Sequence, residues 1–143
     1  MKNIFIIIIV FLSTTMFLQN IIVWGDSYNG TISKSDINGN NVEVVCTNQT
    51  HVKRVRIDRE NSKIYWAATY ANKIRCCRFD GTEIVDIIST VTADDIAMVE
   101  IDNMHNKIFY AEDGNNTIKS CNFDGSAQQT IIENSGLVLG PRY

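Results

Sequence analysis

The chain has few histidines, no run of basic residues and no Cys-x-x-Cys motif. Its 143 residues include two histidines, and 13 Lys and Arg stand against 16 Asp and Glu. Nucleic-acid binding needs a basic patch or stripe, so we expect no nucleic-acid partner. His51 and His105 lack a repeated metal-ligand spacing, and we interpret both as surface loop residues. The sequence therefore predicts no metal site and no cofactor.

Motifs of enzyme active sites are also missing. The sequence contains no nucleophile elbow, phosphate-binding loop or paired-carboxylate arrangement. Asp58 and Asp102 are better explained as turn residues, because an Asp side chain can accept hydrogen bonds from the backbone of its own turn. We therefore expect a protein without catalytic activity.

One long apolar run is present, over residues 4–18, after Lys2. This pattern predicts a secretory signal peptide over residues 1–25, cut after Gly25. The alternative is an uncleaved signal anchor, because residues 4–24 are about long enough to span a bilayer. We expect a secreted or extracellular chain, with membrane contact only if the segment stays uncleaved. Three Asn-x-Ser/Thr sequons fit that compartment and predict glycosylation at Asn29, Asn48 and Asn115.

A repeat organises the rest of the chain. One short apolar and aromatic pattern occurs three times, as Ile21-Ile22-Val23-Trp24, Lys63-Ile64-Tyr65-Trp66 and Lys107-Ile108-Phe109-Tyr110. From 24 to 66 is 42 residues and from 66 to 110 is 44, about the length of one four-stranded propeller blade. A second landmark keeps the same spacing, as Asn38-Gly39, Asp80-Gly81 and Asp124-Gly125.

Each period divides into four short strands joined by turns, an all-β pattern. The first complete set covers residues 55–58, 63–67, 73–79 and 83–88, and the second covers 99–102, 107–111, 117–123 and 128–133. Three strands precede them, over residues 21–24, 31–37 and 42–46. The Asp-Gly pairs predict tight hairpins, because Gly tolerates positive φ. The prediction is eleven strands in three units of 3+4+4.

The combination of motifs resembles the low-density-lipoprotein-receptor class B repeat, or YWTD repeat. The matching segments are Val23-Trp24-Gly25-Asp26, Tyr65-Trp66-Ala67-Ala68, Phe109-Tyr110-Ala111-Glu112 and the three Gly-containing pairs, and the stretch Ser135-Gly136-Leu137 with Pro141-Arg142 resembles the lead into a further blade. The best-preserved copy departs from the family at Ala67-Ala68, where a polar contact would be missing. The resemblance implies a six-bladed β-propeller, of which residues 26–143 would form a partial arc of about three blades.

An arc leaves the faces of its terminal blades uncovered. Three explanations stay open: a truncated product, an oligomer that closes a ring from several arcs, or a stable short arc.

The four cysteines, Cys46, Cys76, Cys77 and Cys121, are expected to be free and mostly buried. Cys77 and Cys121 hold the same repeat position on neighbouring blades, roughly 10 Å apart, beyond the ~7 Å reach of a disulfide. Adjacent Cys76 and Cys77 must point to opposite faces of one strand.

The resemblance also implies a function. Propellers of this family in lipoprotein-receptor and Wnt-co-receptor ectodomains bind protein ligands, usually through the loops of one face. The residues expected in those loops and best suited to such contacts are Tyr70, Asp94, Asp95, Glu112 and Asp113, an aromatic anchor with an acidic cluster. Glycans on the three sequons would project from the same face and shield it. We predict an extracellular, receptor-like protein-binding module; the alternatives are a metal-dependent lactonase- or esterase-like propeller enzyme and a non-functional fragment of a longer receptor.

Overall fold

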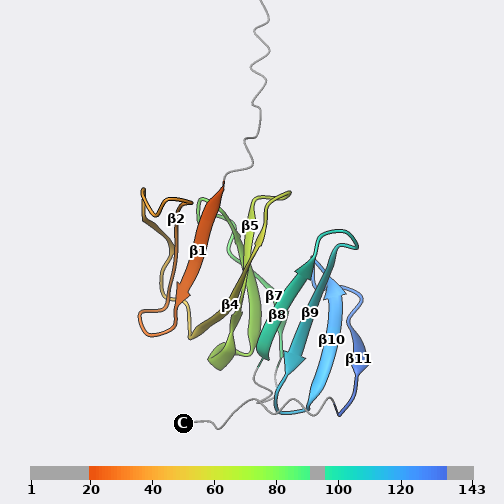
Figure 1. Ribbon diagram of the computed structural model, residues 1–143. Helices are drawn as coiled ribbons and strands as arrows, with labels where there is room; N and C mark the ends of the chain where they lie inside the picture. The colour runs from red at the N-terminus through yellow and green to blue at the C-terminus, as the bar shows by residue number, and fades with distance from the viewer. Residues whose placement is uncertain (1–19, 91–95, 135–143) are drawn as a thin grey trace, which may run out of the picture.

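Eleven strands in three antiparallel sheets make up the described part of the chain. The computed structural model describes residues 20–90 and 96–134. The first sheet holds β1 (Ile21–Asp26), β2 (Thr31–Asp36) and β3 (Glu43–Cys46). The second holds β4 (Val52–Asp58), β5 (Lys63–Ala68), β6 (Lys73–Arg78) and β7 (Val85–Ser89), and the third holds β8 (Ile96–Asp102), β9 (Lys107–Glu112), β10 (Thr117–Asn122) and β11 (Gln129–Ile132). The all-β prediction and the 3+4+4 division are confirmed, and the sheets stand side by side in an arc (Figure 1).

The strand boundaries differ from the predicted ones mainly at the first strand of each complete sheet. β4 begins at Val52 rather than 55, and β8 begins at Ile96 rather than 99. A register shift interrupts each strand, between Lys53 and Arg56 in β4 and between Ile96 and Met98 in β8. Such an irregularity breaks the strict alternation on which the prediction relied. A short 3-10 helix, η1 (Thr69–Ala71), was also not predicted.

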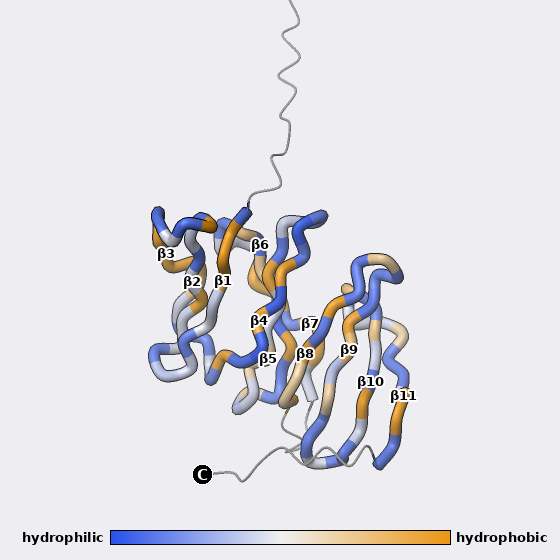
Figure 2. Tube along the Cα trace, in the orientation of Figure 1, coloured by the Kyte–Doolittle hydropathy of each residue, from blue (hydrophilic) through white to orange (hydrophobic). Residues whose placement is uncertain are grey.

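The second sheet is buried on both faces. Along β5, Ile64, Trp66 and Ala68 pack in an apolar cluster with Ile32 and Cys46 of the first sheet. The intervening side chains of β5 point the other way, into a second cluster that the second and third sheets share, which contains Tyr65, Ala67, Ile96, Val99 and Tyr110. Figure 2 shows the hydrophobic residues concentrated along the strands. Alternate residues of one strand thus join three sheets into a continuous stack.

The Gly-containing turns set how closely neighbouring sheets approach. Gly81 has a φ of +81°, and a Cβ built on it would lie 2.1 Å from the carbonyl oxygen of Val45 in the first sheet. Gly125 has a φ of +82° and would place a Cβ 2.1 Å from the carbonyl oxygen of Ile87 in the second. The predicted positive φ is confirmed. The same glycines also allow direct backbone contact between sheets, which no larger residue permits.

The outward face of the first sheet is open. Trp24 is 38% exposed and Ile22 is 45% exposed, whereas Trp66, which is 42 residues after Trp24 in the repeat, is 0% exposed. Trp66 is covered because its side chain packs against the preceding sheet. The third sheet likewise exposes Ile131 and Ile132 on β11. Exposed apolar side chains are therefore present on both terminal sheets of the described part of the chain.

Several predictions concern residues at or beyond the ends of the described ranges. Residues 1–19 lie outside the described residues, so the apolar leader stays a prediction. The predicted cut after Gly25 falls inside β1, whose residues pair with β2 from Ile21 to Asp26. The stretch from Ser135 onward also lies outside the described part. Within the described ranges, no helix is long and apolar enough to cross a membrane.

Candidate functional site

Four connections of the described part of the chain lie at one end of the three sheets, called the lower end as drawn in Figure 1. They join β1 to β2, β3 to β4, β5 to β6 and β9 to β10, because the strands of each sheet alternate in direction. Neighbouring connections are tied together by backbone hydrogen bonds. The Gln49 N–H donates to the Gly30 carbonyl over 2.8 Å, and the Thr69 N–H donates to the His51 carbonyl over 3.4 Å. The first three of these connections are therefore linked to one another rather than being separate loops.

An ordered aromatic pair lies on this surface. Tyr70, in η1, stacks on His51, with ring centroids 4.1 Å apart and planes inclined by 16°. Tyr70 remains 70% exposed. η1 ends at Asn72, whose left-handed backbone carries an N–H that donates to the Thr69 carbonyl over 3.0 Å. Stacking and the capped turn hold the Tyr70 ring in place while leaving it open to a partner.

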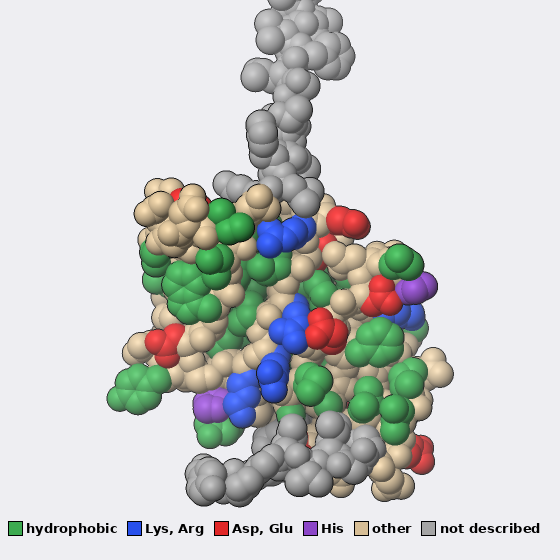
Figure 3. Space-filling view, in the orientation of Figure 1, with side chains coloured by type: hydrophobic (Ala, Val, Ile, Leu, Met, Phe, Trp, Pro, Cys, Tyr) green, Lys and Arg blue, Asp and Glu red, His purple; other side chains and the backbone are tan. Residues whose placement is uncertain are grey.

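Basic side chains follow the aromatic pair. Lys53 and Arg54 are exposed on β4, two and three residues after His51. Figure 3 shows Lys and Arg side chains gathered over β4 beside a histidine. The exposed charge nearest to His51 in sequence is therefore positive.

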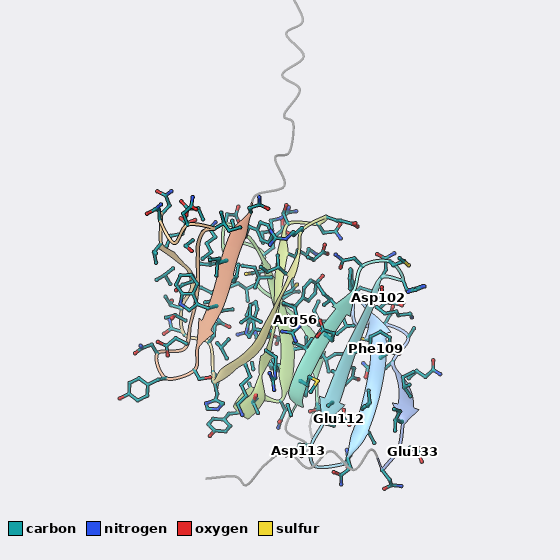
Figure 4. All side chains as sticks on the ribbon, viewed as in Figure 1. Arg56, Asp102, Phe109, Glu112, Asp113 and Glu133 are labelled. Carbon is teal, nitrogen blue, oxygen red and sulfur yellow. The ribbon has the colours of Figure 1, made fainter. Side chains whose placement is uncertain are left out.

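The predicted acidic cluster is only partly described, and one member is inside the protein. Asp94 and Asp95 lie outside the described residues. Glu112 is 1% exposed, and its carboxylate pairs with the Lys119 ammonium at 2.7 Å and accepts a hydrogen bond from Thr117 Oγ1 at 3.2 Å. Asp113 follows it at the lower end and is half-buried (Figure 4). Glu112 is thus placed to order the β9–β10 turn rather than to reach solvent.

All three predicted glycan acceptors are exposed at the lower end. Asn29 lies in the β1–β2 turn, Asn48 in the β3–β4 connection and Asn115 in the β9–β10 turn. The amide of Asn29 donates to Asp26 Oδ2 over 2.7 Å. Asn29 and Asn48 also line one shallow depression together with His51. Glycans at these two positions would therefore stand beside the aromatic pair.

The remaining candidate groups are engaged in turns or in the core. Asp58 accepts hydrogen bonds from the Asn61 backbone and amide at 3.1 and 2.7 Å, and Asp102 pairs with His105 Nδ1 at 2.7 Å, as expected of turn residues. The contact with His105 holds the pKa of Asp102 below its usual value. In residues 20–90 and 96–134, no three His, Cys, Asp or Glu side chains gather in a way that could hold a metal ion.

The cysteines are buried, as predicted. All four are free thiols in the structure. Cys76 and Cys77 belong to different apolar clusters, so they do point to opposite faces of β6. Burial raises the pKa of Cys121 to about 11, which keeps it a thiol at neutral pH. Sequence reasoning missed one contact, between the sulfur atoms of Cys46 and Cys77 at 3.4 Å.

No family model and no curated protein matches the chain. Solved structures do resemble it. A chain of a nidogen–laminin complex superposes with a TM-score of 0.74 at 13% identity, over 81% of this chain and 45% of that one. A catalytically inactive virginiamycin B lyase of Staphylococcus aureus, solved with quinupristin, superposes with a TM-score of 0.65 at 13% identity. The match covers 78% of this chain and 37% of the lyase. A streptogramin B lyase superposes with a TM-score of 0.65 at 16% identity, over 82% of this chain and 39% of the lyase.

These likenesses concern architecture, because identities this low carry no further information. The chain spans less than half the length of each of these structures. Its three sheets superpose on part of a larger assembly of similar sheets, and the repeat, the sheet order and the stacked cores agree with that placement. The described residues therefore form an arc of a β-propeller.

Proposed function

We propose that this chain is an extracellular, YWTD-like propeller module that binds a protein ligand at its lower end and performs no catalysis. The observation that carries the proposal is the Tyr70–His51 pair, an exposed ring held in a fixed orientation. Aromatic anchors of this kind dominate the binding energy of protein interfaces, because they bury a large area at little cost in conformational entropy. The nidogen–laminin neighbour supports a protein-binding role by likeness of fold.

The chemistry around the pair suggests the kind of ligand. Lys53 and Arg54 present exposed positive charge next to His51. A partner that offers an apolar or aromatic side chain to Tyr70 and a carboxylate to the basic pair would match both features. Charges at the rim of an interface mainly speed association and select partners, whereas the buried aromatic contact holds the complex together.

Glycosylation would restrict this surface. Asn29 and Asn48 share a depression with His51, so glycans there would hinder access to the pair. We therefore expect the ligand to bind better when these two acceptors carry no glycan. Asn115, on the more distant β9–β10 turn, should matter less.

Binding assays with matched variants test the proposal. The first probe is laminin, the partner named for the nidogen neighbour, and a panel of extracellular proteins follows. Tyr70→Ala should weaken binding of a positive probe by about tenfold or more. Met104→Ala is the control, because Met104 is 85% exposed in the β8–β9 turn at the opposite end. Equal affinity in the two variants would refute the lower end as the binding surface.

An activity assay addresses the competing class of function. The lyase neighbours make quinupristin a suitable substrate, and a lactone panel with added calcium or a chelator covers hydrolysis. We expect no turnover above buffer. Turnover that the chelator abolishes would overturn the non-catalytic assignment.

A further inference from the structure

The thiols of Cys46 and Cys77 meet in the core between the first and second sheets. Cys46 ends β3 and Cys77 lies on β6, and both belong to the cluster that contains Ile32, Ile64 and Trp66. Their sulfur atoms are 3.4 Å apart, and the two residues are 31 positions apart in the chain. Both side chains are buried, at 4% and 0% exposure.

The repeat shows that a cysteine at position 46 is a departure from the pattern of this chain. Cys46 pairs with Ile32 in the first sheet, and the same place in the second sheet is held by Ile88, which pairs with Ile74. Cys77 pairs with Ile64, and its counterpart Cys121 pairs with Ile108. The second interface thus sets Ile88 and Cys121 in one apolar cluster, whereas the first sets two cysteines against each other.

The backbone around the pair is closely fixed. Val45, the neighbour of Cys46, contacts the turn that follows β6 so tightly that a Cβ on Gly81 would lie 2.1 Å from its carbonyl oxygen. Lys34 Nζ donates to the Phe79 carbonyl over 2.6 Å, a second link between the same two sheets. A disulfide bond is about 2.05 Å long, so the sulfur atoms, 3.4 Å apart, need to approach by roughly 1.4 Å to form one.

We propose that Cys46 and Cys77 form a disulfide that covalently links the first two sheets when the chain folds in an oxidising compartment, while Cys76 and Cys121 remain thiols. Cys77 and Cys121 hold equivalent positions in the repeat and are kept apart by the blade spacing. Cys46 and Cys77 hold different positions, and the offset between neighbouring sheets brings them together. This inference stands apart from ligand binding and does not depend on it.

The oxidant is a small-molecule or protein disulfide. The Cys46 thiolate attacks one sulfur of that disulfide, forms a mixed disulfide and releases one thiolate. Cys77 then loses its proton and attacks the Cys46 sulfur, which releases the second thiol. One disulfide is reduced to two thiols and one protein dithiol is oxidised, so atoms and electrons balance.

Thiol counting on the full chain tests the proposal. The reduced, unfolded chain is refolded in a buffer of reduced and oxidised glutathione, alkylated under denaturing conditions and analysed by mass spectrometry. We expect two alkylated thiols without reduction and four after it, and a linked peptide pair that contains Cys46 and Cys77. Four alkylated thiols before reduction, or a link between any other two cysteines, would overturn it.

Variants separate the bond from general effects of reductant. The melting temperature of the oxidised wild type should fall on the order of 10 °C on reduction, because the bond closes a long loop in the unfolded chain. Cys46→Ile installs the side chain that the next repeat uses, and its melting temperature should not respond to reductant. Cys121→Ala should keep the full response. If Cys46→Ile does not fold, the peptide map of the wild type still decides, since it needs no variant.

Discussion

Arg56 of β4 and Glu100 of β8 hold the same position in successive repeats, and they pair with each other. The Arg56 Nε lies 2.8 Å from Glu100 Oε1, which joins the second sheet to the third. Arg56 is labelled near the centre of the view in Figure 4. The two side chains are 32% and 55% exposed. One repeat position thus carries opposite charges on neighbouring sheets, so a contact between equivalent sites becomes attractive.

Reversal of this pair should show the attraction. Arg56→Glu places two carboxylates together and should lower the unfolding free energy by about 1 kcal/mol or less, because both groups are partly solvated. The double variant Arg56→Glu with Glu100→Arg should recover most of the loss. Urea unfolding of all four members of this cycle measures the coupling. Additive single effects would show that the contact contributes nothing.

The glycine turns allow a cleaner comparison. Gly39 and Gly81 occupy the same turn position with φ of +79° and +81°, but a Cβ on Gly39 meets nothing within 4 Å. Gly39→Ala should therefore lower the unfolding free energy by only about 1 kcal/mol, the cost of placing a side chain on a backbone with positive φ. Gly81→Ala should cost at least about 1–2 kcal/mol more, because its Cβ also collides with the Val45 carbonyl. Equal losses of unfolding free energy would contradict the role given to the close approach.

The ion pair between buried Glu112 and partly exposed Lys119 should affect stability rather than ligand affinity. Glu112→Ala removes a carboxylate that is 2% exposed and leaves the 27% exposed Lys119 side chain without it, so the unfolding free energy should fall by about 1–2 kcal/mol. Glu112→Gln retains hydrogen bonding and should cost less. Thermal unfolding measures both, and laminin or another positive probe reports affinity in the folded variants. A variant that folds as well as wild type and loses binding would restore Glu112 as a ligand contact.

Acid stability should depend in part on Asp86. Hydrogen bonds from Lys73 and Arg75 lower its pKa from the ordinary value of 3.8. A depressed folded-state pKa stabilises the protein above the unfolded value, and this stabilisation is lost as the pH falls through the folded value. Asp86→Asn should therefore be less stable than wild type at pH 7, by less than about 1 kcal/mol, and the difference should shrink below pH 4. Melting temperatures from pH 7 to 2 check this; a constant difference would refute it.

The repeat in the sequence predicted most of the fold. The spacing of apolar residues and glycines located all eleven described strands, because those residues form the sheet interfaces and the turns. The early starts of β4 and β8 were missed, since the register shifts near Arg54 and Met98 leave no mark in an alternation pattern. Arg54 itself adopts a φ of +49°, a conformation that an arginine in the sequence does not predict.

The candidate site was less predictable. Tyr70 was selected as an aromatic in an expected loop, but its partner His51 was interpreted as an isolated residue, because their contact depends on how two connections meet. Glu112 was selected for its charge, and its burial follows from Lys119 on the adjoining strand. One signal could have flagged the Cys46–Cys77 contact, namely the cysteine at 46 where the next repeat has Ile88. Its partner still required knowledge of the offset between sheets.

The close backbone approach at Gly81, repeated at Gly125, has a consequence for how such a protein can evolve. The spacing between neighbouring sheets is set by main-chain atoms and by glycine, which has no side chain. The curvature of the arc therefore does not depend on which apolar residues fill the space between the sheets. The interiors are then free to drift, as Trp66 to Tyr110 and Cys46 to Ile88 show within one molecule. A solved structure only 13% identical in sequence still superposes with a TM-score of 0.74, as expected if the main chain sets the sheet arrangement.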